Sequence, residues 1–267
     1  MPPTVGHVSE TSVVPSGPLL ILSPHLDDAA LSCGALLDRD EPITVCDVFT
    51  ERPEPEQHTH WDRNCGFDGS HTAHEARWAE ERDAFAGGPH TLAAVDLVDG
   101  QYVPGIRDES DARRITRAVD TWLETVGHHA TVVVPVGAGN PHGRASTLAT
   151  RWRARRAGTF AFNNSPDHLF VRDAVLTHLR ERTEVTLLLY EEYPYLFAMG
   201  GALVVRALAA WLDRDAIALS MPVDRAAKAE RISAYQSQLS LLFRATSREA
   251  IERALPAHER YWELRVS

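Results

Sequence analysis

One histidine and two adjacent aspartates stand directly after an apolar run near the start of the chain, in the stretch LLILSPHLDDAAL. Imidazole and carboxylate are ligands that suit a divalent metal such as zinc, and the spacing of His25 and Asp28 would let both reach one ion. A bound dication would stabilise the neighbouring carboxylates and leave Asp27 to act as a general base toward water. The other interpretation is that Asp28 caps the following helix and His25 is an ordinary surface residue.

Five short apolar runs alternate with helical patterns and indicate how this cluster is positioned. The runs are typical of strands buried on both faces: PLLILS, ITVCDVF, LAAVDLV, ATVVVPV and EVTLLLY. The helical patterns cover residues 28–37, 72–86, 109–126 and 166–179. This alternation predicts an α/β fold with a Rossmann-like, mostly parallel sheet and helices on both faces. Sites in such sheets lie at the carboxyl ends of the strands, where this cluster falls.

The length of the chain predicts one domain with insertions, over residues 18–267, after a flexible lead-in over residues 1–17. We also expect a small C-terminal addition to the sheet. Two regions interrupt the alternation. Residues 51–70 read as a long loop, and residues 140–164 read as a basic insertion or lid. The arginines of the insertion favour a lid or a site for an anionic substrate group, with a solvated face as the alternative.

The composition is that of a globular protein with an acidic balance. A net charge of −10 argues against partners such as nucleic acid or an anionic membrane. No apolar run approaches the roughly 18 residues of a membrane span, and no signal peptide is evident. Three cysteines without a CxxC pair predict no disulfide framework and favour the cytoplasm. The oligomeric state stays open.

Six segments together resemble the PIG-L/LmbE-like family of zinc-dependent N-deacetylases, which act on N-acetylglucosaminyl-type substrates. They occur in the family's order: SPHLDDAALSCG, WDRNCGFDG with ARWAEERDAF, LVDGQY, SPDHLFVRDAVL, LLYEEYPYLF and KAERISAYQSQL. The first resembles the PHPDD-type signature and the fourth the HPDH-type motif. The resemblance extends over most of the chain, and it implies the LmbE-like version of the α/β fold.

The resemblance also implies roles for individual residues. His25 and Asp28 match two zinc ligands, and His168, the last residue of SPDH, matches the third. One Zn²⁺ per chain is implied, although another divalent metal can occupy such a site. Asp27 matches the general base that activates water for attack on an amide carbonyl.

Substrate contacts follow from two further matches and are complicated by one departure. Arg77 and Asp99 match positions that bind the sugar in relatives. Ser165 is a third residue expected to contact substrate. It occupies the first position of the HPDH-type motif, where the family has a histidine that stabilises the transition state. A hydroxyl cannot supply the charge of an imidazolium, and losing one such stabiliser commonly costs about 10² to 10³ in rate.

Three explanations of Ser165 stay open. His142, which follows VPVGAGNP, can replace the missing histidine, with the Arg-rich insertion separating the two halves of the motif. An arginine of the insertion can approach the oxyanion instead. In the third case the protein binds a sugar amide and barely hydrolyses it. The first is favoured because it keeps the order of the parts.

The expected function is therefore hydrolysis of an N-acyl, in the first place an acetyl, group from an amino sugar or sugar conjugate, a small-molecule partner of bacterial specialised metabolism. The alternatives are a binding protein with weakened catalysis and a zinc amidase that acts on a non-sugar amide.

Several other polar residues could have a functional role, but for most of them a structural role is the simpler interpretation. A second metal site among His58, His60, His71, His74 and Cys65 is disfavoured because their spacing fits no closed zinc pattern. Tyr193 and Tyr195 are candidates for hydrogen bonds to substrate. The segment from Lys228 to Gln238 reads as packing rather than chemistry.

Overall fold

The computed structural model describes residues 16–103, 107–127, 129–137, 166–195, 201–243 and 247–266. A seven-stranded sheet in the order β3-β2-β1-β4-β5-β7-β6 organises them. Its strands are β1 (Leu19–Ser23), β2 (Ile43–Asp47), β3 (Thr91–Ala94), β4 (Thr131–Pro135), β5 (Thr186–Tyr190), β6 (Arg214–Pro222) and β7 (His258–Val266). The first five are parallel, whereas β7 pairs antiparallel with both β5 and β6. The expected mostly parallel α/β sheet is confirmed.

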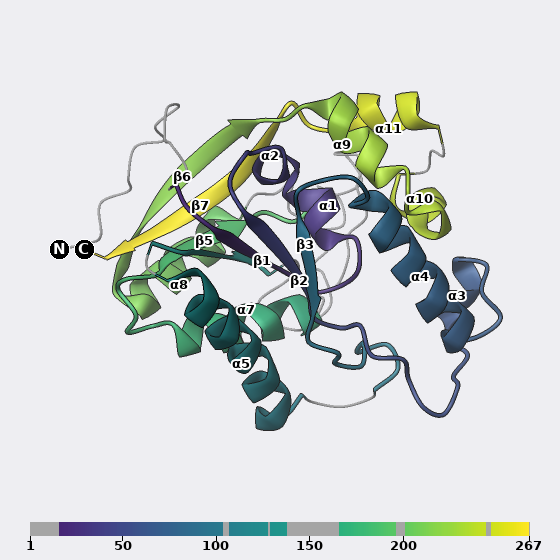
Figure 1. Ribbon diagram of the computed structural model, residues 1–267, viewed down its shortest axis with the longest axis horizontal. Coiled ribbons are helices and arrows are strands. Elements are labelled where there is room, and N and C mark those ends of the chain that lie inside the picture. The colour runs from purple at the N-terminus through teal and green to yellow at the C-terminus, as the bar shows by residue number, and fades with distance from the viewer. Residues whose placement is uncertain are drawn as a thin grey trace.

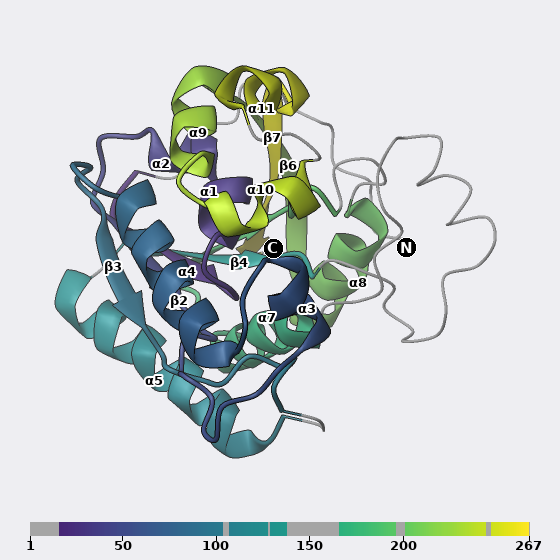
Figure 2. The ribbon, with the colours of Figure 1, turned by 90° about the vertical axis from the view of Figure 1, so that its right-hand side faces the viewer.

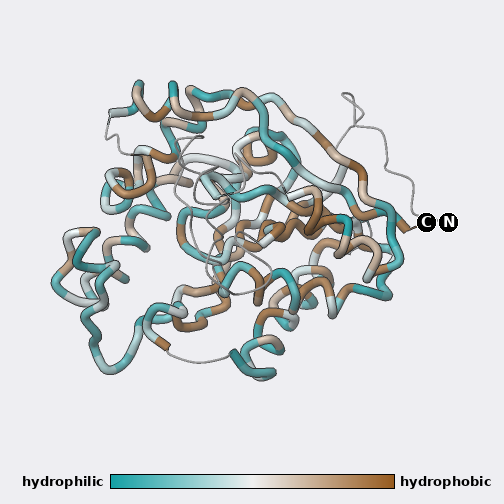
Figure 3. Tube along the Cα trace, turned by 180° about the vertical axis from the view of Figure 1, so that it is seen from behind, coloured by the Kyte–Doolittle hydropathy of each residue, from teal (hydrophilic) through white to brown (hydrophobic). Residues whose placement is uncertain are grey.

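Helices cover both faces of the sheet (Figure 1). They are α1 (Asp28–Ser32), α2 (Gly34–Leu37), α3 (His60–Asn64), α4 (Ser70–Ala84), α5 (Glu109–Val126), α7 (Pro166–His178), α8 (Ala202–Leu212), α9 (Arg225–Ile232), α10 (Gln236–Leu242) and α11 (Arg248–Ala254). The apolar side chains of α5, α7 and α8 pack on one face, and those of α1 and α2 pack on the other. The apolar colour is accordingly gathered in the middle of the molecule in Figure 3. No described helix combines the length and hydrophobicity that a membrane crossing requires.

The position of β1 explains where a site can form. This strand lies between β2 and β4, so that the chain runs outward from it in both directions across the sheet. Loops that leave neighbouring strands on opposite faces separate at such a point and open a crevice at the carboxyl ends. The segment that follows β1 begins with Pro24 and His25, and it therefore enters this crevice.

The structure differs from the sequence expectations, or refines them, at three places. The helix expected over residues 28–37 is broken into α1 and α2 at Cys33, whose φ of −122° is not helical. The expected loop over residues 51–70 contains α3, which Thr59 caps by accepting a hydrogen bond from the Asp62 amide. The C-terminal addition extends the central sheet as β6 and β7. The insertion over residues 140–164 lies outside the described residues.

A buried ion pair ties the C-terminal addition to the turn between α1 and α2. Lys228 of α9 is fully buried and pairs with Glu259 of β7 at 2.5 Å. The Glu259 carboxylate also accepts hydrogen bonds from the backbone amides of Gly34 and Ala35, at 3.0 and 2.8 Å. A Cβ atom at Gly34 would lie 2.8 Å from Cδ of Lys228, so the close approach requires glycine there. Lys228 thus serves packing, as the sequence indicated.

Candidate metal and active site

The junction between β1 and α1 holds the predicted cluster in a constrained turn. Ser23 Oγ donates to the carbonyl of His25 at 2.7 Å and accepts from the amide of Ala29 at 3.2 Å. Asp28 Oδ2 accepts from the amide of His25 at 2.9 Å. Asp27, between them, has a φ of 120°, a conformation that non-glycine residues rarely adopt. Strain of this kind concentrates at functional sites, where it aims a side chain.

The structure brings the three predicted metal ligands together. Asp28 Oδ2 lies 3.3 Å from Nδ1 of His25 and 3.2 Å from Nε2 of His168, although His168 belongs to α7. One donor atom from each residue lies within 4.8 Å of the others. Two imidazoles, one carboxylate and an adjoining pocket match the three protein ligands and open position of catalytic zinc sites.

The outer nitrogen of each histidine faces a carboxylate. Nδ1 of His168 lies 3.3 Å from Oε1 of Glu192, and Nε2 of His25 lies 3.3 Å from Oδ2 of Asp167. Metal-binding histidines commonly use such partners to fix the tautomer and the orientation of the ring. Burial lowers the pKa of His168, but Asp28 and Glu192 outweigh it and raise this pKa to about 9. The site therefore attracts positive charge, as a cation site must.

Asp167 is itself held by two further groups. Its Oδ2 accepts from the amide of Gly100 at 2.9 Å, and its Oδ1 accepts from Nη2 of Arg107 at 2.9 Å. Burial raises the pKa of Asp167, but the hydrogen bond from His25 and the charges of His25 and Arg107 lower it to about 2. Asp167 belongs to the SPDH segment, but the sequence analysis assigned it no role. Arg107 lies in no motif, and no sequence signal pointed to it.

A second group of potential ligands shares His25. It consists of His25, Asp99 and Asp167, again within 4.8 Å. Asp99 is the more distant member, with its Oδ2 4.0 Å from Nε2 of His25. In the first group, by contrast, Asp28 Oδ2 lies within 3.3 Å of a nitrogen of each histidine. The donor set with His168 is therefore more compact and fits a metal better.

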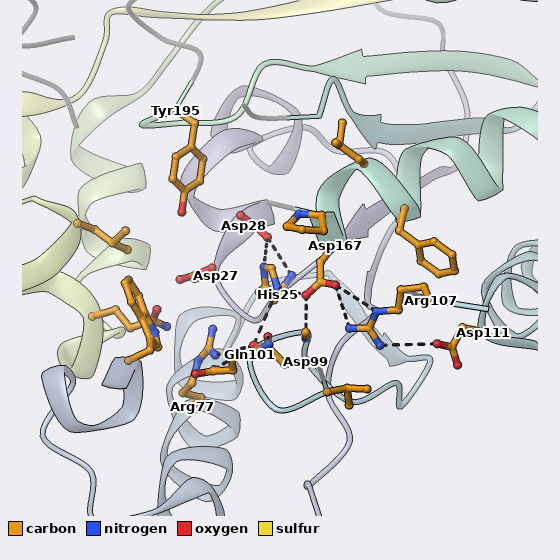
Figure 4. A pocket seen from close by; sticks show the side chains of 18 of the residues that line it. His25, Asp27, Asp28, Arg77, Asp99, Gln101, Arg107, Asp111, Asp167 and Tyr195 are labelled. Carbon is orange, nitrogen blue, oxygen red and sulfur yellow. Dashed lines mark hydrogen bonds and ion pairs between the residues drawn. The ribbon is translucent and has the colours of Figure 1, made fainter. Parts of the chain in front are cut away.

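Asp27 is placed to act on a molecule in the pocket. The residue is buried, its carboxylate lines the pocket, and Figure 4 shows it separate from the hydrogen-bonded group around His25. Burial and the charge of Asp28 raise the pKa of Asp27 to about 7. A carboxylate with a raised pKa is a stronger base than an ordinary one, which suits a general base.

Arg77 and Asp99, the predicted sugar-binding residues, also line the pocket. Arg77 extends from α4, where its Nη2 donates to the carbonyl of Leu26 at 3.1 Å. Its Nη1 lies 3.8 Å from Oδ2 of Asp99. Gln101 supports Asp99 by donating from its backbone N–H to Oδ1 at 2.9 Å. A guanidinium and a carboxylate side by side offer donors and acceptors to hydroxyl groups.

The pocket has a volume of about 970 Å³ and contains several residues that the motifs did not assign. Tyr195 points its hydroxyl toward Asp27 and Asp28 (Figure 4). Trp61 of α3 and Gln238 of α10 line the same pocket. Figures 1 and 2 show α3, α4 and α10 together on one side of the molecule. Tyr193 does not line this pocket; its hydroxyl donates to the carbonyl of Ala254.

The histidines around Cys65 do not form a metal site within the part of the chain that the structure describes. His58, His71 and His74 each contact a backbone carbonyl, at 2.6, 3.1 and 2.9 Å, and His60 pairs with Asn64. Ser165 and His142 lie outside the described residues, so the replacement of the motif histidine stays a prediction.

No protein-family model matches the sequence, and no curated protein matches it. Solved structures do match. The zinc-inhibited form of teicoplanin deacetylase Orf2 is 20% identical, with a TM-score of 0.63 over 92% of this chain and 97% of that one. The A40926 pseudoaglycone deacetylase Dbv21 is 22% identical, with a TM-score of 0.61 over 93% and 98%. A deacetylase–teicoplanin complex is 22% identical, with a TM-score of 0.60 over 94% and 99%. Nearly the whole chain therefore has the fold of these deacetylases, which is the fold expected from the motifs.

Proposed function

We propose that this protein is a metal-dependent hydrolase that removes an N-acyl group, in the first place acetyl, from an amino sugar or sugar conjugate. The observation that carries the proposal is the convergence of His25, Asp28 and His168 beside Asp27, in an open pocket. That constellation supplies a cation site, a base and space for substrate. The same fold carries a deacetylase of the teicoplanin biosynthetic pathway and the A40926 pseudoaglycone deacetylase, which supports the reaction type and a role in specialised metabolism.

His25, Asp28 and His168 would hold a divalent cation, Zn²⁺ by default, which would supply Lewis acidity and make water more acidic. Asp27 takes a proton from the attacking water as the new C–O bond forms at the amide carbonyl. When the C–N bond breaks, Asp27 returns the proton to the departing amine. Glu192 and Asp167 keep the two imidazoles in the orientation that this arrangement requires.

Tyr195 can stabilise the oxyanion that develops during attack. Burial raises the pKa of Tyr195 above its usual range, so its hydroxyl stays protonated at neutral pH. The hydroxyl points toward Asp27 and Asp28 in the pocket (Figure 4). A preorganised donor aimed at developing charge contributes strongly to catalysis. Tyr195 therefore supplies part of the stabilisation that Ser165 cannot, alongside His142 if the insertion brings that residue close.

A conjugate fits the size of the pocket better than a free amino sugar does. The pocket volume of about 970 Å³ lies at the upper end of the range for small-molecule sites. The structures with the same fold include a complex with teicoplanin.

We place the reaction in the cytoplasm, because Cys33, Cys46 and Cys65 are all free thiols.

The test is amine release from a panel of N-acetylated amino sugars and their conjugates, with protein of measured metal content. Wild-type turnover is expected to disappear with a chelator, to return with added metal, and to disappear in Asp27→Asn. Turnover that survives in Asp27→Asn would contradict the role of the base. Fully metallated protein that is active only on non-sugar amides would support the amidase alternative.

A further inference from the structure

Gln238 is a buried pocket residue whose side-chain nitrogen has no hydrogen-bond acceptor among the residues that the structure describes. Its side chain lines the pocket and the residue is only 2% exposed. Its Nε2 atom is buried without an acceptor. Folded proteins pair nearly all of their buried polar groups, because an unpaired one has lost its hydrogen bonds to water without replacement. An unpaired amide nitrogen on a pocket residue therefore points to a ligand that pairs with it.

The residues before Gln238 show that its place is fixed by other contacts. Ser237 bonds to the carboxylate of Glu80 on α4 through both its backbone amide and its hydroxyl, each at 2.7 Å. The hydroxyl of Tyr235 donates to Glu81 on the same helix at 2.9 Å. These bonds hold α10 against α4, the helix that carries Arg77. The amide of Gln238 is thus held at the pocket without taking part in the anchoring.

We propose that Gln238 is a substrate-binding residue that recognises a hydroxyl group on the ring bearing the acylated amine. This deepens the proposed function and rests on it for the identity of that ring. A primary amide offers both donor and acceptor atoms, and a hydroxyl group is the small substrate group that also does both. Arg77 and Asp99 line the same pocket, and Trp61 adds an aromatic surface against which a ring can pack.

A packing role and a binding role for Gln238 predict opposite effects of one substitution. Gln238→Met keeps the length of the side chain and removes the amide. If the amide awaits a ligand, its removal leaves the protein as stable as before or more stable, because a buried unpaired polar group is lost. Affinity for a hydroxylated ring falls at the same time. If the amide supports the fold, stability falls and the selectivity between ligands does not change.

The experiment measures binding by calorimetry in the metal-loaded Asp27→Asn protein, which does not turn over substrate. The probes are N-acetylglucosamine and N-acetylcyclohexylamine, which share the amide and differ in their hydroxyl groups. Gln238→Met should weaken binding of the sugar about tenfold and leave binding of the analogue unchanged. Gln236→Met is the matched control, since this exposed glutamine on the same helix should change neither. The melting temperature of Gln238→Met should equal or exceed that of its parent.

Two results would overturn the proposal. One is a Gln238→Met protein that keeps the full preference for the sugar. The other is a parent protein that binds both probes equally. Because binding is measured without turnover, a failure of hydrolysis in the wild-type protein is a separate outcome. Sugar selectivity that depends on Gln238, in a protein that hydrolyses no amide, would overturn the proposed deacetylation and leave this inference intact.

Discussion

The backbone of Asp27 predicts a conflict between stability and activity. Its φ of 120° and ψ of −29° are the mirror image of a conformation open to ordinary residues, and only glycine adopts the mirror image freely. Such strained residues cost about 1–3 kcal/mol. Its carboxylate is also buried beside that of Asp28, and burial and the charge of Asp28 both disfavour its ionised form. Asp27→Gly should remove both costs together with the proposed base.

The net gain follows from these terms. Glycine loses more conformational entropy on folding, which offsets about 0.5–1 kcal/mol of the relieved strain. We therefore expect Asp27→Gly to raise the free energy of unfolding of metal-stripped protein by about 1–2 kcal/mol. Asp27→Asn keeps the strained backbone and should gain less. Both variants should lose turnover.

Urea unfolding of the metal-stripped proteins measures the difference. Asp108→Gly is the matched control, because Asp108 also precedes a helix but has an ordinary φ of −105° and caps that helix. That control should lose a few tenths of a kcal/mol. An Asp27→Gly protein that is less stable than the wild type by about 1 kcal/mol or more would refute the assignment of strain to this residue.

Further predictions concern the metal site and the buried ion pair. His168→Ala should lose the bound metal, measured as metal per chain after dialysis; a full equivalent retained would exclude it as a ligand. Glu192→Gln should weaken metal affinity about 10- to 100-fold in a chelator competition, because the Nδ1 of His168 loses its charged partner. Lys228→Met should lower the free energy of unfolding by about 3–5 kcal/mol, since it leaves Glu259 buried without a counter-charge. The double variant Lys228→Met/Glu259→Gln should recover much of the lost free energy of unfolding. If it does not, the unpaired charge of Glu259 is not the cause of the loss.

The sequence by itself determined the parallel part of the fold and the core of the site. Continuous apolar runs identified β1, β2, β4 and β5, because strands buried on both faces need apolar side chains throughout. The helix over residues 109–126 matches α5 at both ends. The order of polar residues after β1 pointed to His25, Asp27 and Asp28, because all three lie within one turn of chain. Each of these features is formed by residues close together in the chain, so a short stretch of sequence is enough to predict it.

Strands β6 and β7 were not anticipated because their pattern differs. In β7 buried residues alternate with exposed ones over most of its length, as an antiparallel strand near the edge of a sheet permits. Alternation of this kind is a weaker signal than a continuous apolar run. The segment was therefore read only as part of a small addition, whereas it completes the central sheet.

Only the tertiary structure showed which further residues orient the predicted ones. Asp167 lies 142 positions from His25 and 60 from Arg107, yet it contacts both. Gln238 reaches the pocket because bonds between α10 and α4 place it there. Contacts of this kind depend on how the sheet and its helices pack, and no spacing along the chain records them. The sequence therefore specified the polar cluster after β1, and the packing of the fold specified the groups that orient it.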